Sequence, residues 1–344
     1  MSGAPAVAGD WEQAAPEDVG LDRNLGSFID SKLANVNFPH QLRAIVVARH
    51  GRLAFERYFP DPISGFAQLP QAKRNIASVT KSVTALVYGI ALDRSLVPEP
   101  DAPLMAQFPE YADLAGEEKN ALRVSHALTM TLGFKWNEEL PYGPATNDAS
   151  AMLNSRDPCR FLLARPVVAA PGTKWVYNGG ATELLGRLIA KGTGRSLEMF
   201  ARENLFTPLR IDPGHWGVGA NGQPTASQGL QISARDLARL GQLVLDDGEW
   251  NGRSIVPKRW VSEAFLPRIR IDFRFTYGYQ WRIDDLLWPG ESCLFASGNG
   301  GQRIFVLPAH RLVVATMGNA HNSQTQGIAP RAVVTAVRLA LLPT

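Results

Sequence analysis

Strand-like segments near both ends of the chain constrain the fold of this sequence more than any other feature. Residues 42–59 predict a hairpin, because the apolar run Leu42–Ala48 is followed by a turn at His50-Gly51 and a second apolar run. Such runs, bounded by turn residues, are typical of β-strands. We therefore expect a sheet to which both ends of the chain contribute. The other predicted strands are Tyr277–Ile283 and the pair Arg303–Leu307 and Leu312–Met317, which flank a turn at residues 308–310.

Helical periodicity fills the region between these strands. Apolar residues from Ala181 to Ile189 recur at i, i+3, i+4, i+7 and i+8, which predicts a helix with one buried stripe. A second helix is predicted to begin at Ser233, with Asp236 three residues later as its capping partner. A last helix is expected over about residues 329–342. Prolines and short helical pieces from about Pro98 to Pro171 indicate an inserted helical region.

Composition and charge exclude several classes of protein. Hydrophobic residues make up 45% of the 344 residues and charged residues 19%, which does not fit a disordered chain or a coiled coil. The net charge of +3 rests on 27 arginines and 8 lysines, without a long run of like charges. Nucleic-acid binders usually carry a denser basic patch. We therefore expect no nucleic-acid partner and interpret most arginines as solvated surface groups.

The sequence offers no metal or redox motif. Cys159 and Cys293 form neither a Cys-x-x-Cys pair nor a disulfide framework, so they are interpreted as reduced structural thiols. The six histidines include no His-Glu-x-x-His spacing. We therefore expect no metal site and no cofactor.

Two observations bear on localisation. Met1–Asp10 lacks the basic start and apolar run of a secretory signal, and no later segment reaches about 18 uninterrupted apolar residues. We therefore expect a cytoplasmic protein that does not act at a membrane. The oligomeric state stays open at this point.

The motif Ser78-Val79-Thr80-Lys81 carries the first chemical signal. It opens a helical stretch in which Val79, Val83, Leu86, Val87 and Ile90 predict a buried stripe, with Ser78 and Lys81 together on the other face. Side chains three residues apart on a helix are neighbours, so the amine can reach the hydroxyl. A serine needs such a neighbour to take its proton, and a lysine serves as the base only if its pKa is depressed. The motif predicts a nucleophile, Ser78, activated by Lys81.

Several further segments, in the right order, resemble the class C β-lactamase-related and penicillin-binding-protein superfamily of serine hydrolases. No Gly-x-Ser-x-Gly elbow competes with Ser78 as nucleophile. Ordered agreement at many places is more specific than one short motif. Besides the segment around Ser78, the similar segments are His126–Trp136, Pro171–Gly186, Gly229–Pro257, Tyr277–Ile283 and Ser297–Pro308.

The resemblance implies both a fold and a mechanism. The fold would be of the α/β (α+β) type, with an antiparallel sheet flanked by helices. Residues 1–80 and 210–344 would form the sheet domain and residues 81–209 a mostly helical subdomain, with the active site in the cleft between them. Tyr177 would be the third catalytic residue, and Lys81 and Tyr177 would act as general base and acid around a Ser78 acyl-enzyme. The oxyanion would lie between the backbone N–H groups of Ser78 and Gln302.

Two departures from the family pattern bear on the substrate. Tyr177-Asn178-Gly179 replaces the usual Tyr-x-Asn. Asn299-Gly300-Gly301 stands where β-lactamases have Lys-Thr-Gly, so the cation that would meet a penicillin's carboxylate is missing there. A charge-assisted contact of this kind is worth about 1.5–3 kcal/mol. We therefore expect small esters or amides as substrates, including oligomer amides of the 6-aminohexanoate-dimer hydrolase type.

Further residues are candidates for binding the substrate. Asn299, Gly300 and Gly301 would line the site, because residues without a Cβ let the backbone approach a carbonyl closely. Asn178 would hold the hydroxyl network of Tyr177, although a local turn explains it equally well. Trp136 would form an acyl-pocket wall, as would the aromatic residues Tyr142, Trp175 and Trp288, although simple packing explains each of them as well.

Two other functions are compatible with the sequence. A D-alanyl-D-alanine carboxypeptidase, or a weak β-lactamase, would use the same catalytic residues. A non-catalytic ligand-binding relative would keep the fold but form no adduct on Ser78.

Overall fold

The computed structural model describes residues 11–36, 41–60, 69–139, 142–288 and 290–343. Met1–Asp10, on which the expectation about a secretory signal rests, lies outside the described residues. No helix in the described ranges is long and apolar enough to cross a bilayer. In the same ranges, no three His, Cys, Asp or Glu side chains are grouped to hold a metal ion.

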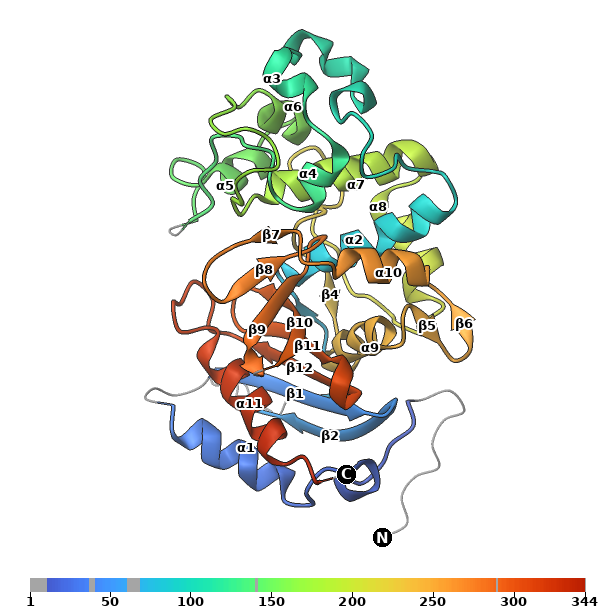
Figure 1. Cartoon of the computed structure of the whole chain (residues 1–344), viewed down its shortest axis with the longest axis vertical. Helices are drawn as coiled ribbons and strands as arrows, with labels where there is room; N and C mark the ends of the chain where they lie inside the picture. Colours follow the sequence, from blue (N-terminus) through green and yellow to red (C-terminus); the bar gives the residue numbers. More distant parts are fainter. Residues whose placement is uncertain (1–10, 37–40, 61–68, 140–141, 289, 344) are drawn as a thin grey trace.

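Eight antiparallel strands form the central sheet, in the order β2-β1-β12-β11-β10-β9-β8-β7. The first and last parts of the chain therefore meet in one sheet, where β1 pairs with β12, as the strand signals at both ends predict. Figure 1 shows this sheet in the lower half of the molecule. The strands are β1 Leu42–Arg49, β2 Arg52–Tyr58, β7 Ile269–Arg270, β8 Phe275–Tyr277, β9 Arg282–Trp288, β10 Glu291–Gly298, β11 Gln302–Leu307 and β12 Leu312–Gly318.

One predicted strand is wrong. Residues 277–283 do not form a single strand, because a turn separates the end of β8 from the start of β9. The N–H of Gly278 donates to the Trp281 carbonyl at 3.0 Å, and Gln280 has a φ of +60°. A left-handed residue cannot continue a pleated strand.

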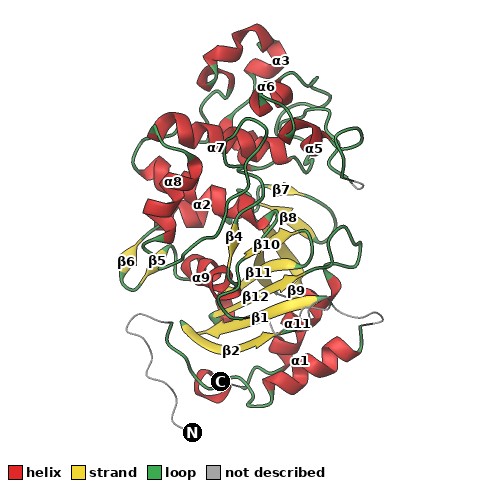
Figure 2. Cartoon of the chain, turned by 180° about the vertical axis from the view of Figure 1, so that it is seen from behind, coloured by secondary structure: helices red, strands yellow, loops and turns green. Residues whose placement is uncertain are grey.

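Helices cover both faces of the sheet. Ile45 and Val47 of β1 point toward α1 (Leu25–Ala34) and α11 (Ile328–Leu339), whereas Val46 and Ala48 point into the core that α9 (Ala234–Leu245) shares. Because β1 is buried on both faces, its middle residues, Ala44–Ala48, form a continuous apolar run in the sequence. The helices lie on opposite sides of the sheet in Figures 1 and 2. The predicted Ser233–Asp236 capping box begins α9.

The remaining helices gather in the upper half of Figure 1, above the sheet. They include α7 (Gly179–Thr193), which ends at a left-handed Gly194 and packs on α2 (Val79–Asp93). The others are α3 Glu117–Asn120, α4 Val124–Leu128, α5 Asp148–Leu153, α6 Pro158–Leu163, α8 Leu197–Ala201 and α10 Lys258–Ala264, with a π-helix at Arg202–Phe206 and 3₁₀ turns at Met105–Gln107 and Pro109–Leu114. Two more 3₁₀ turns lie with the sheet, Pro16–Val19 against β2 and Pro308–His310 between β11 and β12. Short strand pairs are β3 Arg74–Asn75 with β4 Gln231–Ile232, and β5 Glu249–Trp250 with β6 Arg253–Ser254.

Helix α2 is the junction between the sheet and the upper helices. The sequence predicts one buried stripe on it, but every residue from Val79 to Ala91 is buried. The stripe prediction is wrong because α2 packs against β10 on one side and against α7 and α10 on others. A helix enclosed on all sides holds its N-terminal residues rigidly in the interior of the molecule.

Candidate active site

Ser78 lies at the N-terminal end of α2, where three features of the backbone hold it. Ala77 adopts a left-handed conformation with φ +48°, and its N–H donates to the Asn75 side-chain oxygen at 2.8 Å. A non-glycine residue in this region costs about 1–3 kcal/mol and is held by its surroundings. Strand β10 lies close by, since a Cβ on Gly298 would be 2.3 Å from the Ile76 carbonyl oxygen. The hydroxyl of Ser78 is thus presented by a rigid, closely packed turn.

Lys81 is buried and contacts Ser78. Its Nζ donates to Ser78 Oγ at 3.1 Å and to the Ser227 carbonyl at 3.0 Å, and only 3% of the residue is exposed. Burial lowers the pKa of Lys81, but Tyr177 and the carboxylates of Glu138 and Glu183 together raise it above its ordinary value. The condition under which a lysine serves as the base, a depressed pKa, is therefore not met, because of partners that the sequence does not reveal. The carboxylates around Lys81 favour its protonated form.

Tyr177 comes just before α7 and turns toward Lys81. The Lys81 Nζ lies 4.9 Å from the centroid of the Tyr177 ring. Trp175 packs beside it, with ring centroids 6.0 Å apart. Ser78, Lys81 and Tyr177 all line one small cavity of about 10 Å³, so the structure brings the three residues together. We call this space the small cavity; its other lining residues are Ser82, Tyr277, Gln280, Arg282, Phe295, Ala296 and Ser297.

Glu138 is a buried carboxylate that the sequence analysis did not identify. Its Oε1 lies 3.9 Å from Lys81 Nζ, and 7% of its side chain is exposed. Its Oε2 accepts hydrogen bonds from the Trp136 ring nitrogen at 3.0 Å and from the N–H of Gly179 at the start of α7. Glu138 therefore joins Lys81 to the helix that follows Tyr177.

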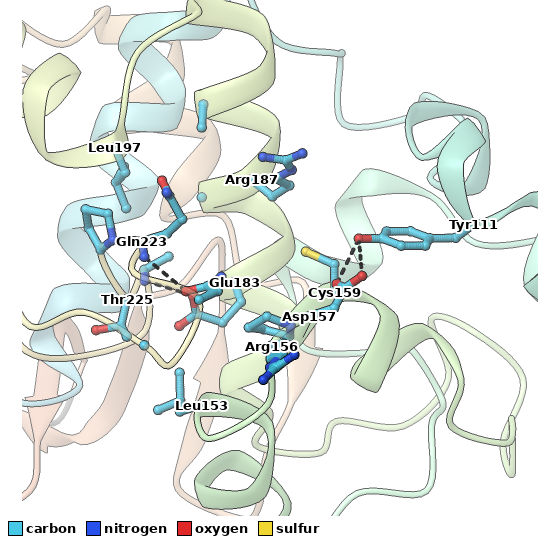
Figure 3. A pocket seen from close by; sticks show the side chains of 17 residues that line it. Tyr111, Leu153, Arg156, Asp157, Cys159, Glu183, Arg187, Leu197, Gln223 and Thr225 are labelled. Atoms are coloured by element: carbon cyan, nitrogen blue, oxygen red, sulfur yellow. Dashed lines mark hydrogen bonds between the residues drawn. The ribbon is translucent and has the colours of Figure 1, made fainter.

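Glu183 supports Lys81 from the other side. Its two oxygens accept from the N–H groups of Ala226 and Ser227 at 3.0 and 2.9 Å, and the Ser227 carbonyl accepts from Lys81. Burial raises the pKa of Glu183, and the bonds to Ser227 and Ala226 oppose this. Figure 3 shows Glu183 reaching from α7 toward this loop, in a separate cavity of about 270 Å³ that Tyr111 and Arg187 also line. The carboxylate fixes the loop that holds the amine.

A larger cavity of about 360 Å³ opens in front of Ser78, and we call it the front cavity. It contains the carboxylate of Glu138 and many neutral polar groups. No lysine or arginine is among the described residues that line it. Its lining consists of Asn75, Ala77, Ser78, Glu138, Tyr142, Ala149, Ser150, Leu153, Asn154, Ser227, Gln228, Asn299 and His321.

The predicted strand-side residues are only partly at this cavity. Asn299 lines it, and its side chain exchanges hydrogen bonds with Asn322. Gly300 and Gly301 have φ values of +95° and +97° and form the turn between β10 and β11, away from both cavities that contain Ser78. Gln302 is buried in β11, where it pairs with Gly298, and its side-chain amide bonds Gly318. Residues of β10, rather than Gln302, face Ser78.

Two other candidates have structural roles in their immediate surroundings. The Asn178 side-chain oxygen accepts from the N–H of Ala181 at 3.2 Å and caps α7, which agrees with the local-turn alternative. Trp136 is buried, packs edge-on against Phe161 and bonds Glu138. Neither side chain lines the small or the front cavity.

Arg282 is the third functional candidate that the sequence analysis missed, with Glu138 and Glu183. Most arginines were interpreted as surface groups and none was singled out for function, yet Arg282 lines the small cavity. It lies in the segment Tyr277–Ile283 that resembles the family, but nothing within that segment marks it as a functional residue. For Glu183 the sequence is equally silent, because the predicted stripe of α7 excludes this position and a distant loop covers it.

Comparisons with known proteins agree on the family and the fold. The beta-lactamase family model matches residues 41–337. A 6-aminohexanoate-dimer hydrolase of Paenarthrobacter ureafaciens is 28% identical over 232 residues, which is 64% of this chain and 56% of that relative, so the match spans little more than half of its length.

Two solved structures share the fold at low identity. EstCE1, a hydrolase with promiscuous acyltransferase activity, has a TM-score of 0.76 at 15% identity over 92% of this chain and 99% of that one. The octameric penicillin-binding protein homologue from Pyrococcus abyssi has a TM-score of 0.71 at 23% identity over 93% and 78%.

Proposed function

The chain belongs to the beta-lactamase family of serine hydrolases, and from this premise we propose that it cleaves small neutral or cationic esters and amides through an acyl-enzyme on Ser78. The observation that carries the proposal is the contact of 3.1 Å between Lys81 Nζ and Ser78 Oγ, beside Tyr177 in one cavity. A hydroxyl held next to a pair of groups that together can take up its proton, here Lys81 and Tyr177, is the arrangement that nucleophilic catalysis requires.

In the first half of the reaction, Ser78 Oγ attacks the substrate carbonyl carbon and its proton passes to the Lys81–Tyr177 pair. In the proposed active form of the pair, Tyr177 has given up its proton and Lys81 keeps its own. The bond to the leaving group then breaks, and the pair returns the proton to the leaving oxygen or nitrogen.

Backbone N–H groups would stabilise the tetrahedral oxyanion. One belongs to Ser78. The second is proposed to come from β10 rather than from Gln302, because β10 pairs with β9 only as far as Phe295 and its residues 296–297 line the small cavity. An N–H at an unpaired strand edge is free to donate to developing charge. Water then attacks the acyl-enzyme and releases the acid, with the same pair moving the proton.

The charge of the front cavity supports the substrate class. A ligand with an anionic group would meet the Glu138 carboxylate there and no arginine or lysine among the described lining residues. Like charge at short range disfavours binding. Neutral esters and amides, or those with an amine such as ω-amino amides, fit this cavity better than penicillins or peptides ending in a carboxylate.

A fluorophosphonate probe and p-nitrophenyl acetate test the proposal. We expect the probe to label one serine in the wild-type protein, identified as Ser78 by peptide mass spectrometry. Ser78→Ala should lose both the label and the ester hydrolysis, whereas the exposed serine variant Ser254→Ala should keep both. An unlabelled wild-type protein, or wild-type turnover in Ser78→Ala, would favour the ligand-binding relative instead.

A further inference from the structure

Arg282 lies against the aromatic residues that surround the reacting groups. It is the first residue of β9, and its guanidinium carbon is 5.9 Å from the centroid of the Tyr177 ring and 5.3 Å from that of Trp175. Lys81 Nζ is 4.9 Å from the same Tyr177 ring. Two cations therefore approach one phenol. Contacts of this kind are favourable, and a negative charge on the phenol oxygen strengthens them.

The charges around Tyr177 are unbalanced. No carboxylate of the described residues forms an ion pair with Arg282 or with the buried Arg303 behind it. Burial and then the neighbouring Arg282 lower the pKa of Arg303 to about 10, a further sign of crowded positive charge. The groups that face Tyr177 are the cations Lys81, Arg282 and Arg303, the carboxylate Glu138, and the phenols Tyr142 and Tyr277.

A role in binding a substrate carboxylate fits Arg282 less well. The small cavity that it lines with Ser78 has a volume of about 10 Å³. This is about the space that one water molecule needs. The larger front cavity, where a substrate has room, is not lined by Arg282. Its charge therefore acts on Tyr177 and not on the body of a substrate.

We propose that Arg282 is a positioning residue that stabilises the phenolate of Tyr177, the group that takes the proton of Ser78. The inference rests on the proposed function above and deepens it. Before turnover the Lys81–Tyr177 pair loses one proton to solvent. The Tyr177 oxygen accepts the Ser78 proton as the bond from Oγ to the acyl carbon forms, and gives it to the leaving group as the bond to that group breaks. The guanidinium exchanges no proton in these steps.

The pH dependence of kcat/KM for p-nitrophenyl acetate tests this role. In Arg282→Met, the ascending limb of the profile should move to higher pH by about one unit, because the phenolate loses a stabilising cation. At pH values below the limb kcat/KM should fall about tenfold, and at pH values above it kcat/KM should stay near the wild-type value. Arg282→Lys keeps a cation, so its limb should move only about half as far as that of Arg282→Met. This variant replaces Arg282→Met in the test if the methionine variant does not fold. In a Tyr177→Phe background, Arg282→Met should change the remaining activity by less than twofold.

The matched control is Arg253→Met, on the exposed strand β6, which should leave the limb in place. An equal loss at every pH in Arg282→Met would overturn the proposal. So would a rise in KM confined to esters that carry a carboxylate, because Arg282 would then bind substrate. Labelling of Ser78 by the fluorophosphonate separates the two proposals. If the probe labels the wild-type protein but the ascending limb does not move in Arg282→Met, only the proposed role of Arg282 is wrong. If the probe does not label the wild-type protein, both the acyl-enzyme mechanism and the role of Arg282 are wrong.

Discussion

The two cavities that meet at Ser78 differ in size and in charge. The front cavity has about 360 Å³ and a carboxylate, Glu138, whereas the small cavity has about 10 Å³ and two cations, Lys81 and Arg282. Negative charge is therefore stabilised on the side where the proton of Ser78 would be taken up, and disfavoured on the side where a substrate has room. Under the proposed mechanism, the charge needed for chemistry would be separated from the charge that selects the ligand.

The largest effect is expected from removing the phenol oxygen of the small cavity. Tyr177→Phe keeps the ring between Lys81 and Arg282 but cannot carry the proton. General acid–base groups typically contribute 10²–10⁴-fold. We therefore expect kcat for p-nitrophenyl acetate to fall at least tenfold with KM nearly unchanged, as steady-state kinetics would show. Tyr111→Phe, which lies at the separate Glu183 cavity, is the matched control. A change in KM alone would show that Tyr177 binds the substrate, and would contradict the assignment of proton transfer to the small cavity.

A smaller effect is expected from neutralising the front cavity. Glu138→Gln keeps the acceptor for Gly179 and Trp136 but removes a charge that helps to raise the pKa of Lys81. Without that charge the Lys81–Tyr177 pair loses its proton more easily, so the ascending limb of kcat/KM should move to lower pH by about half a unit. The direction is opposite to that expected for Arg282→Met.

The same variant tests the selection of substrates. The preference for an ester with an amine over one with a carboxylate should shrink by about threefold to tenfold in Glu138→Gln, measured as the ratio of kcat/KM values. The exposed neighbour Glu139→Gln should leave both the limb and the ratio unchanged. A limb that moves to higher pH would show that Glu138 does not act on Lys81.

The smallest effect on activity is expected from a change remote from both cavities. Ser233 caps α9 by accepting from the Asp236 N–H at 3.1 Å, so Ser233→Ala should lower the free energy of unfolding by about 1 kcal/mol. Denaturant titration would measure this loss, and kcat/KM should stay within twofold. Ser27→Ala, an exposed position inside α1, should cost no stability. A large loss of activity in Ser233→Ala would mean that the two cavities depend on packing far from them.

Local patterns in the sequence were enough for much of the fold and for the core of the site. The β1–β2 and β11–β12 hairpins, helix α7 and the cap of α9 follow from apolar periodicity and turn residues, which act over a few neighbouring positions. The spacing of Ser78 and Lys81 on one helix likewise fixed their proximity, now 3.1 Å. Tyr177 came from the resemblance to the family and not from spacing.

Tertiary structure alone decided the electrostatics. Glu138, Glu183 and Arg282 come from a loop, from α7 and from β9, and no local pattern marks any of them as functional, although Glu183 and Arg282 lie in segments that resemble the family. They surround Lys81 and Tyr177 only because the folded chain brings together segments up to about 200 residues apart and excludes water between them. For the same reason the pKa of Lys81 is raised and not depressed, since the charges that act on it are neighbours in space and not along the chain.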